Sequence, residues 1–544
     1  MKRLILCCDG TWNTPDMEDN GVTSPTNVFK FYNLLAKHDG DGIEQRRYYQ
    51  PGVGTDGLVD RKLGGALGMG LDEKINDAFL WLGLNYKPGD EIYIVGFSRG
   101  AFVARCLAGY LGKGLIDFRK MSVDKVRKTL KACYDEVYKN RSDDPWNGIK
   151  GVKLFDPSDW GDSQVPIRHP ERTIKVKFVG VWDTVGSLGI PDDLELIDML
   201  LEKKDRWEFH DRNLGYHVET GRHAMGLDEM RACFTVTHWS NTRGTRAFPK
   251  HPDILESWFP GVHSDIGGGY SDDSLSSGTL LWMMEEAQKK ELVFKEGALD
   301  SVKECYDPLG EIHNSFKGLF AMLPSRPRNV PSLAKPSIPT KATVRVSDAV
   351  YLRQEMVCPK FPSYRHAVEL APDESSEPVD VFAEQRWNYT GIYLRKGKYY
   401  FEGSGLWMDG KDVCDWKGTE NDQHTFGDGI RWAAGLLGKL ESVWKTVTND
   451  EKADFAFTKR CENVDWFRMV GCIANDNGTD KDKVVAHDGS PEKHQYIDLT
   501  EHTRGKKPLE VKHPGYLYAF ANDIWARYEN NDGIIRLIVH RLKD

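Results

Sequence analysis

The chain has 544 residues, of which 40% are hydrophobic and 28% charged, and its formal net charge is −9. This is the composition of a globular protein, and the length exceeds what one hydrophobic core usually holds, so we expect two or more domains. The acidic balance, without an evident basic face, argues against nucleic acid as the main partner. No uncharged apolar run reaches the ~18 residues that a transmembrane helix needs, so we expect no transmembrane helix.

The first residues combine a basic start with a short apolar run. That run, Leu4–Cys8, ends at Asp9 and is too short for the apolar region of a signal peptide, so it predicts a first buried strand. Ten cysteines are scattered without C-x-x-C pairs, which is typical of reduced thiols. We therefore expect synthesis in the cytoplasm, with any export by a system that needs no cleaved signal.

Residues 1–370 alternate between predicted strands and predicted helices. The strands are Leu4–Cys8, Arg47–Gln50, Glu91–Val95 and Ile174–Trp182, and the helices are Pro25–His38, Leu71–Leu84, Ala101–Tyr110, Val123–Tyr138 and Leu280–Glu291. Strands spaced by helices predict an α/β fold with a mostly parallel sheet, covered on both faces, that binds ligands at the carboxyl ends of its strands. Residues 113–170 interrupt the alternation and are a candidate cap over such a site.

A serine between two glycines stands at the junction of one predicted strand and the next helix. The segment Gly96-Phe97-Ser98-Arg99-Gly100 follows Glu91–Val95 and precedes Ala101–Tyr110. This is the pattern of the nucleophile elbow of α/β-hydrolases, whose tight turn leaves no room for side chains at the glycine positions. The alternative is a helix cap without chemistry. We predict an α/β-hydrolase-like sheet with helical insertions and Ser98 as its nucleophile.

A serine nucleophile needs a base and an acid that orients the base. Asp183 directly follows the buried strand Ile174–Trp182, and His263 follows an apolar run and stands among glycines. In α/β-hydrolases the acid and then the histidine follow the serine along the chain, which is the order found here. The alternatives are a helix N-cap for Asp183 and a structural histidine in a turn for His263.

The oxyanion of an ester hydrolase needs two backbone N–H donors. We expect one from Arg99, the residue after the nucleophile, and the other from Gly10 or Thr11 in the loop after the first strand. Asp9 in that loop is open to two interpretations, a functional carboxylate or a structural one.

A metallohydrolase is the competing interpretation of the same residues. His263, Asp265, Asp9 and Asp183 together offer ligands for a divalent metal. This interpretation requires the serine elbow to be an accident.

The character of the sequence changes near Ala371–Asp380, an acidic, proline-containing stretch. We predict a catalytic domain over 1–370, a linker over 371–380 and an all-β sandwich over 381–544, since short strands and turns dominate beyond the break. The predicted strands are Gly391–Leu394, Lys398–Glu402, Phe467–Ile473, Tyr516–Ala521 and Ile534–His540, with one long helix at Gly429–Val447.

Oxygen-bearing side chains flank a short loop before the last strand. Asn522 and Asp523 lie on one side of it, and Asn530 and Asn531 lie on the other. Calcium prefers such a mixture of carboxylate and amide oxygens, and a polar hairpin loop is the alternative.

Five motifs in order make the first part resemble a known family. They are CDGTWN, GFSRGAFVAR, VGVWDTVGS, RHAMGLDE and WFPGVHSDIGGGY. Over about residues 1–370 the chain resembles the α/β-hydrolase family that includes the phospholipase effectors of bacterial type VI secretion. The resemblance implies a serine lipase or esterase, such as a phospholipase A, with Ser98, Asp183 and His263 as its triad and no cofactor for catalysis. Known lipase effectors of this family carry membrane-anchoring modules, and this chain departs from them because it has no such apolar segment.

The last part resembles the bacterial calcium-dependent galactose-binding lectin fold. The similarity rests on TGIYL, GSGLWMDG and the ND…Y-x-NN-x-G run. It implies calcium held by Asp523, Asn530, Asn531 and main-chain oxygens near Asp409 and Arg527, and a glycan ligand. An exposed Trp407 or Trp525 would stack on a sugar face, and the alternative is that these tryptophans are simply packed. The rival function is therefore a lectin-like binding protein whose hydrolase domain is only a scaffold.

Overall fold

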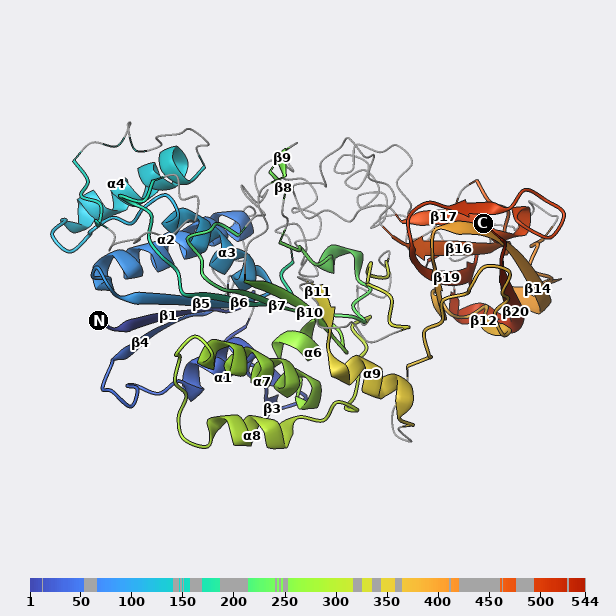
Figure 1. Ribbon diagram of the computed structural model, residues 1–544, viewed down its shortest axis with the longest axis horizontal. Coiled ribbons are helices and arrows are strands. Elements are labelled where there is room, and N and C mark those ends of the chain that lie inside the picture. Colours follow the sequence, from blue (N-terminus) through green and yellow to red (C-terminus); the bar gives the residue numbers. More distant parts are fainter. Residues whose placement is uncertain are drawn as a thin grey trace, which may run out of the picture.

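The computed structural model describes two domains, an N-terminal α/β layer structure and a C-terminal β domain (Figure 1). The residues described are 1–11, 13–52, 66–139, 146, 149, 151–156, 169–185, 214–239, 242–243, 246–247, 253–316, 325–334, 344–357, 364–409, 412–419, 460–461, 463–475, 494–525 and 528–543.

The N-terminal domain is built on one seven-stranded sheet in the order β11-β10-β7-β6-β5-β1-β4. Every pair of neighbours in it is parallel. Its strands are β1 (Arg3–Cys8), β4 (Gln45–Gln50), β5 (Glu91–Phe97), β6 (Phe178–Trp182), β7 (Gly221–Gly226), β10 (Ile254–Phe259) and β11 (Val344–Val346). The inner strands β1, β6 and β7 are buried at every residue, as a parallel sheet covered on both faces requires. The predicted α/β class is confirmed.

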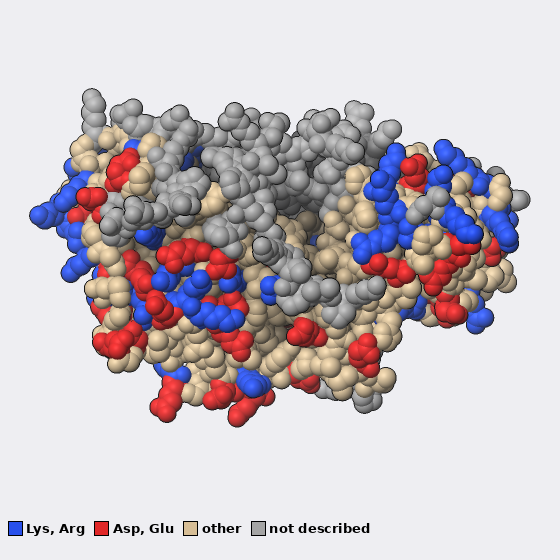
Figure 2. All heavy atoms as spheres, in the orientation of Figure 1, with Lys and Arg blue, Asp and Glu red and all other residues tan. Residues whose placement is uncertain are grey.

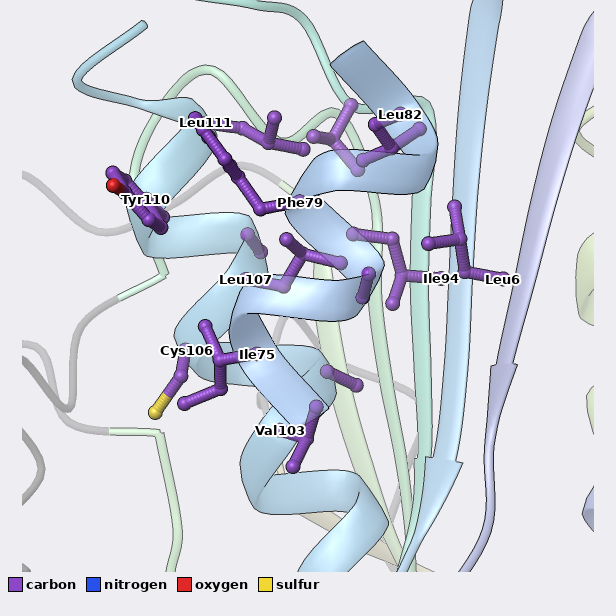
Figure 3. Close-up of a cluster of buried hydrophobic side chains, with 14 of the residues drawn as sticks. Leu6, Ile75, Phe79, Leu82, Ile94, Val103, Cys106, Leu107, Tyr110 and Leu111 are labelled. Atoms are coloured by element: carbon purple, nitrogen blue, oxygen red, sulfur yellow. The ribbon is translucent and has the colours of Figure 1, made fainter. Parts of the chain in front are cut away.

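Helices cover both faces of this sheet. On one face lie α1 (Asn27–Leu34), α7 (Ser274–Gln288) and α8 (Ala298–Cys305), and on the other α2 (Ala66–Asn85), α3 (Arg99–Leu111) and α4 (Val123–Cys133) (Figure 1). Figure 3 shows how Phe79 of α2 and Leu107 of α3 pack with Leu6 and Ile94 of the sheet. A separate buried cluster fills the opposite face.

Several boundaries differ from the predicted ones. The first helix begins only after Thr26, whose hydroxyl caps it by accepting from the N–H of Phe29, and it ends at Leu34. The predicted helix Val123–Tyr138 continues beyond α4 as a π-helical turn, Tyr134–Tyr138. The remaining elements are β2 (Glu18–Asp19), β3 (Val22–Thr23), β8 (Thr242–Arg243), β9 (Arg246–Ala247), α6 (His263–Gly267), α9 (Asp348–Glu355) and the short helices Ala232–Phe234, Leu499–Glu501 and Tyr528–Asn530.

The strand order creates a crevice beside β1. From β1 the chain passes through α1 to β4 on one side, and it returns through α2 to β5 on the other side. Connections that leave two adjacent strands in opposite directions open a crevice at the carboxyl ends of those strands. Asp9 follows β1 and Ser98 follows β5, so the fold places both segments at this crevice.

The C-terminal domain consists of two antiparallel sheets. One has the order β12-β20-β14-β15 with β18 beside β14, and the other has the order β13-β19-β16-β17. A single buried apolar cluster contains side chains of both sheets, among them Phe401, Leu517 and Leu537. The strands are β12 (Val379–Phe382), β13 (Asn388–Leu394), β14 (Gly397–Asp409), β15 (Asp412–Cys414), β16 (Met469–Ala474), β17 (Gln495–Asp498), β18 (Leu509–Val511), β19 (Gly515–Ala521) and β20 (Asn531–Arg541). The predicted helix Gly429–Val447 lies outside the described residues.

The stretch predicted as a linker runs along β20. The N–H groups of Asp373 and Ser376 donate to the carbonyls of Arg541 and Val539, and β12 begins at Val379. The two domains also share a buried apolar cluster, whose members include Trp258 and Val330 as well as Tyr516 and Phe520. The boundaries at 370 and 381 stay predictions.

None of the described helices is long and apolar enough to cross a membrane. On the face in Figure 2, acidic and basic side chains alternate over the N-terminal domain, and basic ones gather on one side of the C-terminal domain.

Candidate active site

The glycines around Ser98 allow an elbow that other residues would block. Ser98 has φ 57° and ψ −122°, outside the region that residues other than glycine commonly adopt. A Cβ at Gly96 would lie 2.4 Å from the carbonyl oxygen of Gly100, and one at Gly100 would lie 2.2 Å from the carbonyl oxygen of Cys8. Both glycines are therefore needed for α3 to pack directly against the ends of β1 and β5.

Asp183 stands at the end of the neighbouring strand, beside the elbow. The N–H of Ser98 donates to the carbonyl of Trp182 at 3.1 Å, which ties the turn to the end of β6. Asp183 is fully buried with φ 37°, and its Oδ1 accepts the N–H of Gly226 at 2.9 Å. The carboxylate is thus fixed by the ends of two strands, β6 and β7.

His263 begins α6, directly after β10, and two carboxylates hold its loop. Asp228 Oδ2 accepts the N–H of Gly261 at 2.6 Å, where φ is 115°. Glu229 Oε2 accepts the N–H of His263 at 3.2 Å and pairs with Arg231 at 2.7 Å. Asp228 and Glu229 belong to the RHAMGLDE motif, to which the sequence alone gave no role.

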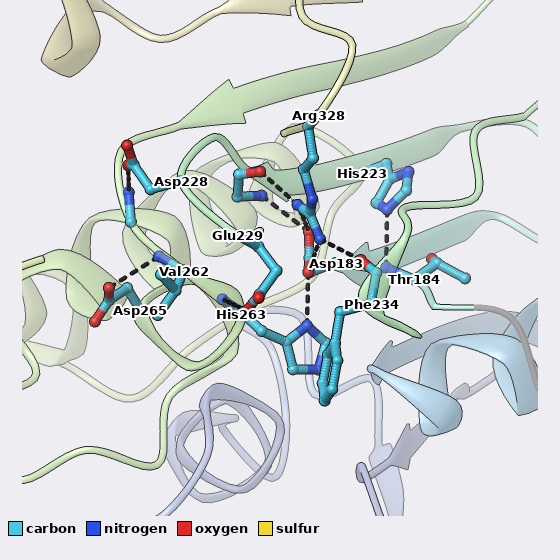
Figure 4. Close-up of polar contacts among 12 residues, drawn as sticks. Asp183, Thr184, His223, Asp228, Glu229, Phe234, Val262, His263, Asp265 and Arg328 are labelled. Atoms are coloured by element: carbon cyan, nitrogen blue, oxygen red, sulfur yellow. Dashed lines mark hydrogen bonds and ion pairs between the residues drawn. The ribbon is translucent and has the colours of Figure 1, made fainter. Parts of the chain in front are cut away.

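His263 faces Asp183, as Figure 4 shows. Its Nδ1 lies 2.6 Å from Asp183 Oδ2, so Nδ1 carries the proton and donates it to the carboxylate. The imidazole is enclosed by Phe97 and Phe234, whose ring centroids lie 4.6 Å and 4.7 Å away. Burial lowers the pKa of His263 below its ordinary value, and the Asp183 carboxylate opposes part of that shift. At neutral pH, Nε2 is therefore a free base.

Two reactive atoms in this site lack a partner. Ser98 Oγ and His263 Nε2 are both buried, and neither has a hydrogen-bond partner among the described residues. Buried polar atoms without a partner are uncommon and mark places where a protein binds or reacts. A serine hydroxyl and an imidazole nitrogen are the pair that a serine hydrolase needs.

Arg328 is a buried residue of the site that no sequence signal identified. Its Nη1 and Nη2 donate to Asp183 Oδ1 and Oδ2 at 2.7 Å and 2.8 Å, as a two-pronged ion pair (Figure 4). Arg328 and the hydrogen bond from His263 outweigh the burial of Asp183 and hold the pKa of this carboxyl far below its usual range. Asp183 is therefore ionised at neutral pH.

The loop after β1 is organised by Asp9. Its Oδ1 accepts the N–H of Gly10 at 2.7 Å, and its Oδ2 accepts the hydroxyls of Thr26 and Tyr49 at 2.6 Å and 2.8 Å. Burial outweighs these hydrogen bonds and raises the pKa of Asp9 to about 6. These three hydrogen bonds support the interpretation of Asp9 as a structural carboxylate.

The same loop touches the elbow. A Cβ at Gly10 would lie 3.1 Å from the Cβ of Ser98. Thr11 and Arg99 are buried and, together with Lys74, line a small pocket beside the elbow. The N–H of Gly10 donates to Asp9, so of the two candidate oxyanion donors in this loop Gly10 already has a partner.

The four residues of the metallohydrolase alternative do not form one cluster, since only His263 and Asp183 contact each other. Asp265 Oδ1 pairs with His313 Nδ1 at 2.6 Å, and its Oδ2 accepts the N–H of Val262. Asp183 faces Arg328, and Asp9 organises the Gly10 loop. In the part of the chain that the structure describes, no group of three or more histidine, cysteine, aspartate or glutamate side chains is arranged to hold a metal.

The structure brings four of the five proposed calcium ligands together. Asp409 lies opposite Asn531 on β14 and β20, and Asn530 Nδ2 donates to Asp409 at 2.7 Å. Asn531 Nδ2 donates to Asp523 Oδ2 at 2.9 Å. The fifth, Arg527, lies outside the described residues.

Three neighbours of that cluster have structural roles. The side chain of Asn522 donates to the carbonyls of Cys461, Val464 and Asp465. Trp407 and Trp525, expected as exposed sugar platforms, are 0% and 4% exposed and pack inside the domain, so that expectation is wrong.

Comparisons with known proteins agree with this site at the level of the family. Residues 2–286 match the model of the family described as T6SS, phospholipase effector Tle1-like, catalytic domain. The uncharacterized protein YEL023C of Saccharomyces cerevisiae is 27% identical over 447 residues, which cover 57% of this chain and 60% of the yeast protein. The chain thus spans less than two thirds of that relative's length.

Two solved structures are similar in part. An uncharacterized protein from Pseudomonas aeruginosa is 17% identical, with a TM-score of 0.34, over 56% of this chain and 48% of that one. The Tle1 effector bound to the VgrG spike of the type 6 secretion system is 18% identical, with a TM-score of 0.24, over 49% of this chain and 51% of that one. TM-scores of this size do not establish a shared overall arrangement. The family model nevertheless matches more than half of the 544 residues, and the chain belongs to the family of Tle1-like phospholipase effectors through its catalytic domain.

Proposed function

We propose that this protein is a serine hydrolase that cleaves carboxylic esters of lipids, in the manner of a phospholipase A. The observation that carries the proposal is the pair of unpartnered buried atoms, Ser98 Oγ and His263 Nε2, with His263 Nδ1 bound to Asp183. The phospholipase family of the catalytic domain supports the lipid substrate class.

The proposed mechanism begins with proton transfer. His263 Nε2 accepts the proton of Ser98 as Oγ attacks the ester carbonyl, and the imidazolium then protonates the leaving alcohol. Asp183 holds the imidazole and stabilises its charged form. Water, deprotonated by the same nitrogen, releases the acyl group from Ser98 and restores the enzyme.

The proposed oxyanion hole is made of main-chain donors. The N–H of Arg99 lies at the start of α3, where helix N–H groups have no partner within the helix. Thr11 would supply the second donor from the loop packed against the elbow. Removing one donor of such a hole costs a serine hydrolase about 100- to 1,000-fold in kcat.

The test is covalent labelling by a fluorophosphonate probe, followed by hydrolysis of phosphatidylglycerol vesicles. Wild type should be labelled and should release fatty acid, and Ser98→Ala should do neither. Ser276→Ala, which alters another buried serine on α7, is the matched control and should be labelled like wild type. A folded wild type that is neither labelled nor hydrolytic would overturn the proposal.

A lectin-like binding protein with an inactive hydrolase domain is the second candidate, and it predicts glycan binding without any ester cleavage. We further propose calcium at Asp409, Asp523, Asn530 and Asn531, because Asn530 contacts Asp409, Asn531 contacts Asp523, and Asn531 Oδ1 is buried without a partner among the described residues. A chelator should then lower the melting temperature of wild type, and Asp523→Ala should abolish that response. An identical melting temperature with and without chelator would contradict calcium binding.

We also propose that any export follows the route of the family, without a cleaved signal. The similar Tle1 effector was solved on a VgrG spike. Co-purification of this chain with a VgrG protein encoded in its own genome would test the route.

A further inference from the structure

Arg328 has the geometry of a residue that orients the acid of the triad. The guanidinium is a rigid planar fork, and its two terminal nitrogens meet the two oxygens of Asp183 one to one. The same nitrogens also donate to the carbonyls of Gly226 and Phe234, and these two hydrogen bonds hold the guanidinium in place. Because Asp183 Oδ2 is also the acceptor of His263 Nδ1, the position of Arg328 sets the direction in which His263 is held.

Arg328 is carried by an extended segment that we call the strap, residues 325–334. The strap lies outside the residues that match the family model. At its start it is fastened to the catalytic domain, where Arg326 N donates to the carbonyl of Met230. Ser325 pairs with Arg231, and Arg328 itself bonds to Asp183, Gly226 and Phe234 of the catalytic domain. Further contacts lead to the C-terminal domain.

Hydrogen bonds to His494, Trp387 and Tyr516 join the strap to the C-terminal domain, and His494 also accepts from Arg326 Nη2 at its Nδ1. His494 Nε2 donates to the carbonyl of Pro327 at 2.6 Å, directly next to Arg328. Trp387 Nε1 donates to Ser325 Oγ at 2.8 Å, and the N–H of Leu333 donates to the hydroxyl of Tyr516 at 2.6 Å. Val330 and Leu333 are buried in the apolar cluster shared with that domain.

We propose that Arg328 is a positioning residue of the triad, and that the C-terminal domain supports catalysis by holding the strap that carries it. This inference rests on the proposed serine-hydrolase function. It gives the C-terminal domain a role that needs neither a glycan nor calcium. The hydrogen bond from His494 to Pro327 keeps the backbone next to Arg328 in place, and so helps to keep the guanidinium against Asp183.

The loss of the guanidinium has two separable consequences. The carboxylate of Asp183 keeps the N–H of Gly226 but loses the two donors that fix its orientation. A misplacement of about 1 Å in a catalytic group costs on the order of 100-fold in rate. The negative charge of Asp183 is also no longer balanced by an arginine, so it stabilises the imidazolium of His263 more strongly. The pH below which activity is lost should therefore rise. A lysine at position 328 would restore the positive charge but not the two parallel hydrogen bonds to Asp183.

The first experiment compares full-length Arg328→Gln and Arg328→Lys with wild type. Hydrolysis of p-nitrophenyl butyrate gives kcat, KM and the pH profile, and the rate of fluorophosphonate labelling gives the reactivity of Ser98 alone. We expect Arg328→Gln to lower kcat and labelling about 100-fold with little change in KM, and to move the acidic limb to higher pH. Arg328→Lys should recover part of kcat and keep the wild-type limb. Arg353→Gln is the matched control, since Arg353 is equally buried but donates to the carbonyls of Pro308 and Gly310, away from the triad.

The second experiment loosens the strap from the C-terminal side. His494→Phe and Trp387→Phe each remove one donor and keep an aromatic ring, and we expect each to lower kcat about 10-fold at unchanged KM. His502→Phe is the control, because His502 bonds the carbonyl of Lys507 within its own domain. Wild-type kcat and pH profile in both variants, or in Arg328→Gln, would overturn the role of the strap. An unreactive wild type would instead overturn the proposed function.

Discussion

At the scale of residues, the candidate site is an arrangement of alternating charges around one neutral imidazole. Asp183 and Glu229 approach His263 from two sides, and each is paired with its own arginine, Arg328 and Arg231. A buried carboxylate is costly unless it is paired and hydrogen-bonded. The two ion pairs therefore allow two anions to hold one histidine without forcing it to take up a proton.

The pH dependence of catalysis follows from the burial of His263. Since burial lowers the pKa of His263, the free base persists below the ordinary 6.5 of histidine, and kcat/KM should fall only at lower pH. Asp183 does not contribute to this limb because it stays ionised. The measurement is a profile of kcat/KM for p-nitrophenyl butyrate between about pH 4 and 9, with melting temperatures to exclude unfolding.

Asp9 titrates within the pH range of this profile, so the measurement needs a control for it. Its pKa is raised to about 6, and its protonated form no longer accepts from Gly10 in the same way. In Asp9→Asn only the limb of His263 remains. A midpoint at or above pH 7 in this variant would contradict the expected direction.

Glu229 should matter for both stability and rate. Glu229→Gln leaves Arg231 without its charged partner and weakens the hold on the N–H of His263. Breaking a buried ion pair typically costs about 3–5 kcal/mol, whereas an exposed one is worth about 0–1 kcal/mol. Urea unfolding of Glu229→Gln, beside Asp465→Asn in the exposed pair with Arg468, measures the difference. An equal loss of unfolding free energy in the two variants would show that the Glu229–Arg231 pair contributes no more to stability than an exposed pair.

At the scale of elements, the sequence predicts what is local. The buried strands and the glycines of the elbow follow from short patterns, and the carboxyl ends of β5 and β6 lie side by side because parallel strands share one edge. Ser98, Asp183 and His263 are brought to that edge as their positions after strands suggest. Arg328 lies 145 residues from Asp183 in an irregular segment, and no periodicity connects the two. A hydrogen bond between residues so far apart in the chain cannot be predicted from the pattern of a single sequence.

Two glycines of α3 should respond oppositely to alanine. At Gly100 a Cβ would meet the carbonyls of Cys8 and Asp9 at 2.2 Å and 2.4 Å, so Gly100→Ala must push α3 away from β1 and displace the elbow. At Gly109, which is exposed on the same helix, a Cβ meets nothing within 4 Å. Gly109→Ala should stabilise the helix by about 0.5–1 kcal/mol and keep full activity.

The measurement for this pair is thermal unfolding together with fluorophosphonate labelling. We expect a lower melting temperature and weak labelling for Gly100→Ala, and an equal or higher melting temperature for Gly109→Ala. Normal labelling of Gly100→Ala would mean that the helix and β1 are less closely packed than the structure has them.

At the scale of the whole molecule, the two domains are joined more closely than the sequence predicts. An acidic, proline-containing stretch at 371–380 is typical of a linker, yet it lies along β20. The sequence pattern is local, whereas the interface is made by residues far apart, such as Trp258 and Tyr516 in one cluster. The candidate catalytic domain therefore extends its contacts, through the strap, into the β domain.

This organisation predicts that residues 1–370 do not form a stable enzyme alone. Cutting the chain there would expose Met225, Trp258, Val346 and other members of the shared cluster, and each large apolar side chain returned to water costs about 1.5–3 kcal/mol. Losses of this size approach the whole stability of a typical domain, ~5–15 kcal/mol. The strap would also lose His494 and Tyr516, so the backbone that carries Arg328 would be held from the catalytic domain alone. We expect the fragment to aggregate, or to unfold well below the full chain and label slowly. A monomeric fragment with the full chain's melting temperature and labelling rate would show instead that the catalytic domain is self-sufficient and that the β domain serves binding alone.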